Sequence, residues 1–317
     1  MTLHDDITDI AGLRVGHDTN IEAGTGCTVV LCDRSAKGGV DVRGGAPATR
    51  ETDLLRPMHL VEEVHAIVLT GGSAYGLDAA SGVMRYLEEH QIGLDVGVAR
   101  VPIVPAAALY DLPFGSATIR PDAAAGYRAC EQATAEVVAQ GNVGAGTGAT
   151  VGKKHHFRFA MKGGIGSASM QLPDGTLVGA IAAVNAWGDV LDPQTRQVIA
   201  GSRAPEHEKI DLAHPFHNTT IAVVATNAYL TKEEVNKVAQ MAHNGLALVI
   251  EPAHTMFDGE TVFALALGSK EQALLDAALA AYQVSMIGAA AVSTLARAVV
   301  KGVRHASDLH GIPATRH

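Results

Sequence analysis

The segment DLAHPFHNTTIAVVATNA, residues 211–228, joins a polar stretch with two histidines to an apolar stretch, and Asn218-Thr219-Thr220 lie at the junction. A threonine hydroxyl is a weak nucleophile unless a base lies beside it. Cutting the chain before a threonine supplies such a base, because the new α-amine has a pKa of about 7.7–8.0. Asn218 and Thr219 are therefore a candidate self-cleavage site, with Thr219 as the nucleophile. The alternative is a loop that enters a strand, where threonine is common.

A glycine-rich stretch, GNVGAGTGATVGKK at residues 141–154, has some features of a phosphate-binding loop. Such a loop needs a glycine five residues before the Gly-Lys pair and a Ser or Thr after it. Here Thr147 lies five residues before Gly152, and Lys153 is followed by Lys154, so the motif fails twice. The glycines still allow the backbone to approach another strand or a reacting carbonyl closely, with a lysine at the end of the stretch.

The other candidate residues follow none of the spacings that metal or serine sites need. Fifteen histidines are present without an HExxH pattern, and no serine lies in a GxSxG turn. The cysteines form no CxxC pair and are interpreted as buried small residues; they are Cys27, Cys32 and Cys130. We therefore expect neither a catalytic metal nor a classical serine triad.

Composition restricts the class of protein and of partner. The 317 residues are 47% hydrophobic and 18% charged, which is typical of a globular chain with a large core. A net charge of −9 without clustered Lys or Arg argues against nucleic-acid and anionic-membrane surfaces, so small molecules or proteins are the expected partners. The first residues, MTLHDDITDI, lack the basic and apolar regions of a signal peptide, and the expected location is the cytoplasm.

The pattern of apolar residues predicts mixed α and β structure without a linker that would divide it. Residues 64–72 read as a buried strand that ends in a glycine turn, and residues 73–90 as the helix that follows. Capping boxes predict helix starts at Thr231 and at Ser269, the second before an Ala-rich run to about Lys301. Further strand candidates are CTVVLC, GTLVGAIAAVNAWGD, TTIAVVATNA, LALVIE and TVFALALG.

Ordered motifs along nearly the whole chain resemble the L-aminopeptidase/D-alanine esterase-amidase family, which includes β-aminopeptidases and nylon-oligomer hydrolases. These motifs are DVRGGAPATRETDLL, LTGGSAYGLDAASGV, VPIVPAAALYDL, GNVGAGTGATVGK, AAVNAWGDV, HNTTIAVVATNA and HTMFDGETVFALALG. The resemblance implies an α/β fold, a four-layer αββα sandwich of the N-terminal-nucleophile hydrolase type that ornithine acetyltransferase also has.

The same resemblance implies a single domain, 1–317, that cuts itself into chains 1–218 and 219–317. The two chains would remain associated, and several such heterodimers would pack into a homo-oligomer. No metal and no organic cofactor are implied.

Site residues follow from the resemblance position by position. Thr219 matches the nucleophile, with its freed amine as base, and Asn218 matches the last residue of the larger chain. Lys153 matches an active-site lysine whose cation would keep the amine neutral and favour negative charge on a reacting oxygen. Asn185, in VNAWGD, matches an asparagine that donates an amide N–H to the oxyanion or orients the amine.

Two acids and a tyrosine complete the implied site. Asp258 and Glu260, in FDGETVF, match a pair that are both aspartates in the nylon-oligomer hydrolases, so Glu260 departs by one methylene. Two residues apart on extended backbone, they would point the same way, one fixing the nucleophile and the other supporting it. Tyr110 matches a tyrosine that lines the substrate pocket.

The sequence thus predicts an amide hydrolase that acts through an acyl-enzyme, and Asn-Thr-Thr is similar to the threonine branch that cleaves 6-aminohexanoate (nylon) oligomers. One alternative is a β- or L-aminopeptidase, in which an acid such as Asp111 would bind the substrate's ammonium group. A second is an acyltransferase like ornithine acetyltransferase, with an amine as acceptor in place of water. A third is a binding or scaffold protein that stays uncut.

Overall fold

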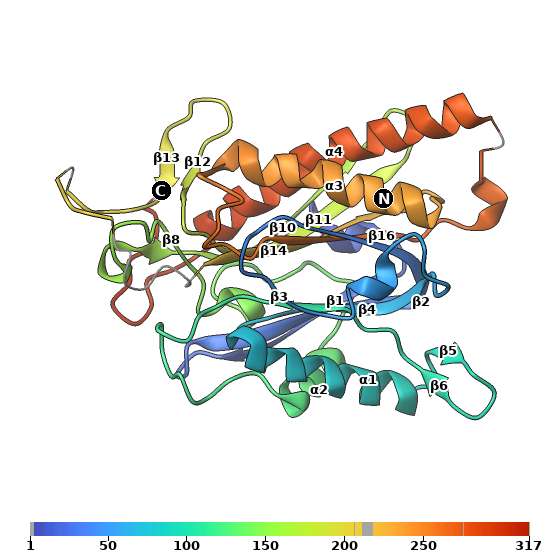
Figure 1. The fold of residues 1–317 in the computed structure, drawn as a ribbon, viewed down its shortest axis with the longest axis horizontal. Coiled ribbons are helices and arrows are strands. Elements are labelled where there is room, and N and C mark those ends of the chain that lie inside the picture. The colour runs from blue at the N-terminus through green and yellow to red at the C-terminus, as the bar shows by residue number, and fades with distance from the viewer. Residues whose placement is uncertain (1–2, 206, 211–217, 275, 317) are drawn as a thin grey trace.

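Helices cover both sides of a β structure that is itself two layers thick in the described part of the chain. Helices α3 (Lys232–Val249) and α4 (Ala277–Arg304) lie on one side, and α1 (Ala79–Glu89) and α2 (Ala123–Glu131) lie on the other. The expected four-layer αββα sandwich is confirmed. Figure 1 shows the computed structural model, which describes residues 3–205, 207–210, 218–274 and 276–316.

Among the described residues, nine strands form one sheet that supplies both β layers, in the order β10-β11-β14-β16-β2-β4-β7-β3, with β1 paired to β2. Their bounds are β1 Leu13–Asn20, β2 Thr25–Val42, β3 Ala48–Arg50, β4 Glu63–Thr70, β7 Ala106–Ala108, β10 Gly164–Gln171, β11 Leu177–Asn185, β14 Thr219–Thr226 and β16 Thr261–Ala266. The long strand β2 takes part in both layers, because residues 27–31 pair with β4 and residues 37–42 pair with β16.

Short elements connect the main ones. The short strands are β5 Leu94–Asp95, β6 Arg100–Val101, β8 Thr150–Val151, β9 Met161–Lys162, β12 Asp189–Leu191, β13 Val198–Ala200 and β15 Ile250–Glu251. The 3-10 helices are η1 Ile7–Asp9, η2 Asp53–Leu55, η3 Ser73–Asp78, η4 Gly144–Gly146, η5 Phe157–Phe159 and η6 Lys270–Gln272.

Strand alternation separates the apolar side chains of β14 into two cores. Ile221 and Val223 enter the core between the β layers, whereas Ala222 and Val224 enter the core beneath α3 and α4. Buried on both faces, β14 is held in one register. Another core joins α1 and α2 to the second β layer.

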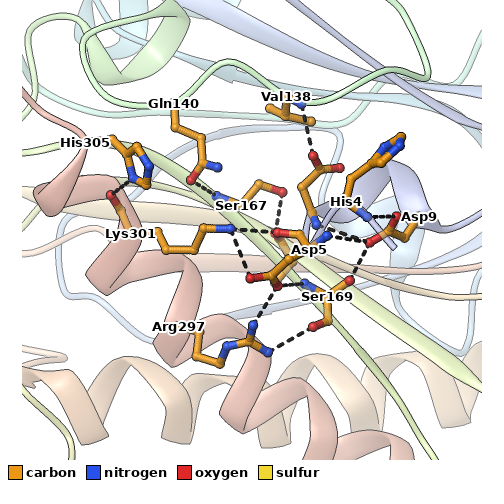
Figure 2. A network of polar contacts seen from close by, with 12 residues as sticks. His4, Asp5, Asp9, Val138, Gln140, Ser167, Ser169, Arg297, Lys301 and His305 are labelled. Carbon is orange, nitrogen blue, oxygen red and sulfur yellow. Dashed lines mark hydrogen bonds and ion pairs between the residues drawn. The ribbon is translucent and has the colours of Figure 1, made fainter. Parts of the chain in front are cut away.

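The N-terminal segment is tied to β10 and α4 by the polar contacts in Figure 2. The Asp5 carboxylate pairs with Arg297 at 2.6 Å, and the Asp5 carbonyl accepts a hydrogen bond from Lys301 Nζ at 2.7 Å. Ser169 of β10 donates its hydroxyl to Asp9 at 2.5 Å. Residues from the beginning of the chain thus contact its last long helix.

Two of the predicted helix starts are wrong. Ser73 has a φ of 56°, a left-handed conformation that an α-helix excludes, so residues 73–78 form η3 and α1 begins later. The capping box at Ser269 closes only the single turn η6, whereas the side chain of Asp276 accepts N–H bonds from the next turn and starts α4. The capping box at Thr231 does start α3, as predicted.

One strand prediction is also wrong. Most of LALVIE belongs to α3, which continues to Val249 and leaves only β15 after it. The reason is helical spacing, because Val235, Ala239, Ala242 and Leu246 already form an apolar stripe that faces the core. The other strand candidates lie in β2, β11, β14 and β16, as predicted.

Helix α4 is long and apolar, with a mean hydropathy of 1.4 over its most apolar window, which by length and composition suits a membrane span. Its residues Ile287, Leu295 and Val299 are fully buried in the core that α4 shares with α3 and the sheet. One face of α4 thus packs into this core, and 39% of its most apolar window is buried.

Candidate active site

Thr219 is the first residue of β14, and the sheet places it opposite a second expected site residue. In the antiparallel pairing of β11 with β14, Asn185 lies directly opposite Thr219, so the two share one face of the sheet. That face is the one between the β layers, whereas Thr220 faces α3 and α4. The geometry therefore favours Thr219 over Thr220 as the reacting hydroxyl.

The parallel neighbour β16 places the acidic turn beside the same hydroxyl. Ile221 of β14 pairs with Thr261 of β16, so Thr219 comes level with Gly259. A Cβ atom built on Gly259 would lie 2.8 Å from Thr219 Oγ1. Only glycine lets the threonine side chain lie against the backbone between the two acids.

The proposed scissile bond is buried. Asn218 is 2% exposed and Thr219 3% exposed, and the Thr219 hydroxyl contacts the carbonyl oxygen of Asn218. The Asn218 side chain donates to the carbonyl of Phe257 at 3.3 Å. The rest of the polar segment before the junction, residues 211–217, lies outside the described residues. The hydroxyl is thus next to the peptide group that self-cleavage would attack.

Lys153 is brought to the site by the end of the glycine-rich stretch. Its backbone N–H donates to the carbonyl of Trp187 at 3.0 Å, which attaches the stretch to the segment after β11. Its side chain is buried, and Nζ donates to Asn185 at both the backbone O (2.9 Å) and Oδ1 (2.8 Å). Lys153 and Thr219 are therefore both neighbours of Asn185, the lysine through hydrogen bonds and the threonine through strand pairing.

The side-chain amide of Asn185 connects three segments. Its Oδ1 also accepts from the backbone N–H of Thr150 at 2.9 Å, and its Nδ2 donates to the carbonyl of Tyr110 at 3.0 Å. Half-buried Tyr110 thus contributes its backbone to the site, in addition to any role of its ring. Because these bonds fix the amide plane, Asn185 holds the lysine in place.

Burial shifts the pKa values of a base and an acid in the site toward their uncharged forms. Burial lowers the pKa of Lys153 well below its ordinary value; the charge of Asp258 opposes this shift, and the cation of Lys162 adds to it. Burial, and then the charge of Glu260, raises the pKa of Asp258 to about 7. A neutral Lys153 can accept a proton, a different state from the cation that the resemblance implies.

The two acids bond to the protein around the nucleophile. Asp258 accepts from the Trp187 N–H at 3.1 Å and from the Thr255 hydroxyl at 2.6 Å, and Glu260 accepts from the His254 N–H at 2.8 Å. Within the described part of the chain, neither carboxylate hydrogen-bonds the nucleophile. The two acids thus flank Gly259 and bond to groups of the protein around the nucleophile.

Asp111, the acid considered for binding a substrate ammonium group, is buried and bonded within the protein. Its carboxylate accepts from the Thr25 hydroxyl and from the Gly72 N–H, both at 2.7 Å. Burial raises its pKa to about 6, although these two bonds oppose that shift. Each carboxylate oxygen of Asp111 thus accepts a hydrogen bond from within the protein.

Three contributors to the site escaped sequence reasoning, namely Thr150, Thr255 and His254. Thr150 stands inside the quoted glycine-rich stretch, and the other two precede Asp258 in HTMFDGE, so the motifs contained them without distinguishing them. Their contributions depend on where a backbone N–H or a hydroxyl points in the folded chain, and a sequence pattern does not show this. Among the described residues, no group of three His, Cys, Asp or Glu side chains is arranged to hold a metal ion.

Comparison with known proteins gives matches over nearly the whole chain. The model of Peptidase family S58 matches residues 5–316. An uncharacterized aminopeptidase of Mycobacterium tuberculosis is 46% identical over 340 residues, which cover 98% of this chain and 96% of that protein. The 6-aminohexanoate-oligomer endohydrolase of a Kocuria species is 31% identical over 272 residues, which cover 81% of this chain and 73% of that enzyme.

The fold also matches a solved structure. The L-aminopeptidase D-Ala-esterase/amidase from Ochrobactrum anthropi, a variant of the Ntn (N-terminal-nucleophile) hydrolase fold, superposes with a TM-score of 0.75 at 18% identity. The match covers 96% of this chain and 87% of that one. At this identity the likeness concerns the fold, and it confirms the expected Ntn type of αββα sandwich.

Proposed function

This chain belongs to peptidase family S58, and we propose that Thr219 is its nucleophile, freed when the chain cuts itself after Asn218. Membership of the family makes the protein a hydrolase of peptide or amide bonds. The observation that carries the proposal is the contact of the buried Thr219 hydroxyl with the Asn218 carbonyl. Asn185, which pairs with Thr219 in the sheet, also accepts a hydrogen bond from the buried Lys153.

Self-cleavage needs the Thr219 hydroxyl to attack the carbonyl carbon of Asn218 while a base removes its proton. Thr219 has no free α-amine in the intact chain, so a side chain must act as the base, and the neutral amine of Lys153 suits this role. The proton passes to the departing nitrogen, and an ester joins Asn218 to the hydroxyl. Water then hydrolyses the ester and releases the Asn218 carboxylate and the Thr219 amine.

Substrate hydrolysis repeats this chemistry with a new base. The freed α-amine of Thr219 takes the proton of its own hydroxyl, which attacks the substrate carbonyl. The substrate's amine leaves with a proton, and water releases the acyl group. Lys153 and the Asn185 amide stabilise charge that develops on the reacting oxygens, and the charge of Asp258 acts on the new ammonium group.

The two proposed chains are interleaved, which supports their staying together. Strands β14 and β16 of the 219–317 chain lie between β11 and β2 of the 1–218 chain and pair with both. The contacts of Arg297 and Lys301 with Asp5 in Figure 2 also cross between the two chains. We propose that such heterodimers assemble further into a homo-oligomer. Light scattering would measure the mass of this oligomer.

We predict that the purified protein contains two chains. A cut after Asn218 gives chains of 218 and, from 317 − 218, 99 residues, the second starting TTIAVV. The chains should co-purify because their strands share one sheet. Intact mass and N-terminal sequencing check this, and a fully active but uncut protein would contradict the proposal.

For the substrate we propose linear amides that include 6-aminohexanoate-type oligomers, cut without a requirement for a free amino end. The burial of Asp111 and its hydrogen bonds to Thr25 and Gly72 support this choice, because they engage within the protein the acid that would bind an ammonium group. The second candidate is an aminopeptidase, which the name of the 46% identical relative favours.

We predict hydrolysis of 6-aminohexanoate oligomers whose amino end is blocked, at internal bonds, because nothing in the proposed mechanism uses that end. Mass spectrometry of the products identifies the bonds that are cut. The same assay with β-alanyl and L-aminoacyl amides measures turnover of substrates that have a free amino end. Turnover limited to substrates with a free amino end would favour the aminopeptidase. Transfer of an acetyl group from an acetylated amino acid to an added amine would favour an acyltransferase.

A further inference from the structure

A second lysine, Lys162 of β9, is completely buried close to the proposed site. Its Nζ donates to the backbone carbonyls of Ala149 at 2.6 Å and Thr147 at 3.0 Å, and it lies 4.6 Å from the centre of the Phe114 ring. Burial lowers the pKa of Lys162 to about 7, opposed by the charge of Asp111. The proposed reaction assigns no step to this lysine, although burying an amine is costly unless its hydrogen bonds are satisfied.

The carbonyls that Lys162 holds belong to residues 144–149, here called the glycine loop. The glycine loop also packs on Asp111: a Cβ atom built on Gly148 would lie 2.7 Å from the Asp111 Cβ and 2.8 Å from its Oδ2. Only a residue without a side chain allows this approach. A buried amine and a buried carboxylate therefore both contact the glycine loop, the amine through the carbonyls of Thr147 and Ala149 and the carboxylate at Gly148.

Both of these groups connect to Asn185 by short paths. Thr150 directly follows the glycine loop, pairs with Lys162 across β8 and β9, and donates its N–H to Asn185 Oδ1. Tyr110, the neighbour of Asp111, accepts from Asn185 Nδ2. The position of the Asn185 amide, and with it that of the lysine it holds, thus depends on where the glycine loop lies.

We propose that Lys162 and Asp111 form a clamp on the glycine loop that positions Asn185 and Lys153 for the reaction. Lys162 and Asp111 are positioning residues, because neither touches the scissile bond. The clamp explains why a lysine and an aspartate occupy the core between the glycine loop and its neighbours. Its effect on activity rests on the proposed function, whereas its effect on the loop does not.

The chain offers a matched control in Lys232, another buried lysine whose Nζ donates to backbone carbonyls. Its partners are Leu54 (2.9 Å), His59 (2.7 Å) and Val61 (2.8 Å), at the start of α3 and away from the glycine loop. Lys162→Met and Lys232→Met each remove one buried amine and leave backbone carbonyls unpaired. Both are therefore expected to lower the melting temperature, and only the first should disturb the site.

The first measurement is hydrogen exchange of residues 144–153, made on both variants in the uncut Thr219→Ala background. We expect the Thr150 amide to exchange at least about fivefold faster in Lys162→Met, since the variant removes the hydrogen-bond donor of the Thr147 and Ala149 carbonyls. In Lys232→Met it should exchange as in the parent. Parental exchange in Lys162→Met, or equally fast exchange in Lys232→Met, overturns the clamp.

The second measurement is the rate of self-cleavage and the turnover of a linear amide. Lys162→Met should cut about 10- to 100-fold more slowly and lose kcat with little change in KM, because small displacements of reacting groups are costly. Lys232→Met should match the wild type in both. A wild type that neither cuts nor hydrolyses amides refutes the proposed function, and hydrogen exchange still decides the clamp.

Asp111→Asn replaces Lys162→Met if the latter gives no folded protein. It preserves volume while removing the charge that faces Lys162 and one acceptor for Thr25 or Gly72. Faster exchange of the Thr150 amide in this variant supports the clamp, and unchanged exchange contradicts it.

Discussion

Thr219→Ala is expected to give a folded, uncut chain without hydrolytic activity. One hydroxyl performs both the attack on Asn218 and the attack on substrate, so its removal stops both. Loss of a catalytic nucleophile lowers turnover by roughly three orders of magnitude or more. Fold and stability should change little, because the substitution removes one hydroxyl and one methyl at the edge of β14. Denaturing gels and an amide hydrolysis assay measure both losses.

The matched control for this prediction is Thr220→Val. The Thr220 hydroxyl is buried, has no hydrogen-bond partner among the described residues and faces α3 and α4. Valine keeps its shape and removes no bond seen in that part of the chain. This variant should cut itself and turn over substrate as the wild type does. Thr219→Ser, which keeps a hydroxyl, should retain part of both reactions. A processed, active Thr219→Ala would shift the assignment to another residue.

Lys153→Met is expected to stop self-cleavage while leaving the chain folded. Methionine fills similar space but cannot accept the proton of the Thr219 hydroxyl, and general-base catalysis contributes about 100- to 10,000-fold. We therefore expect the rate of self-cleavage to fall by at least about 100-fold. Mass spectrometry of a fresh preparation, sampled over time, measures this rate. The adjacent Lys154 is the control, because its amine pairs with Asp189 at 2.9 Å, and Lys154→Met should cut normally.

The pH dependence of self-cleavage tests the same role. If neutral Lys153 is the base, the rate rises with pH as its ammonium form loses a proton. Because burial lowers the pKa of Lys153 well below 10.5, the rise should be complete well before an ordinary lysine would titrate. A rate that falls over this range would show that the cation is the active form, as the resemblance implies.

For Lys153, the sequence predicted the presence of the residue in the site but not its protonation. A lysine after a glycine-rich stretch was visible in the sequence, and the motif predicted its membership of the site. Its burial was not visible, since it depends on β11 and on segments that are distant along the chain. The lowered pKa of Lys153, which shifts this residue from the expected cation toward the neutral amine, follows from that burial.

The sequence by itself determined the family, because seven ordered motifs resemble it, and that resemblance implied the αββα fold. The periodicity of the strands alone indicated only mixed α and β structure. The sequence also identified Asn218-Thr219, Lys153, Asn185 and the acidic pair as one candidate set. Helix starts at residues 73 and 269 were wrong because φ at one residue and a competing cap, rather than apolar spacing, decided them.

Only the tertiary structure decided which groups touch. Strand pairing puts Asn185 opposite Thr219, and parallel register puts Gly259 beside it, although these residues lie up to 74 positions apart. Asp111 read equally well as an ammonium receptor or as a structural acid, and its bonds to Thr25 and Gly72 settled where its oxygens point. The physical reason is that side-chain direction, burial and pKa are set by neighbours that packing brings together, and a linear pattern does not contain those neighbours.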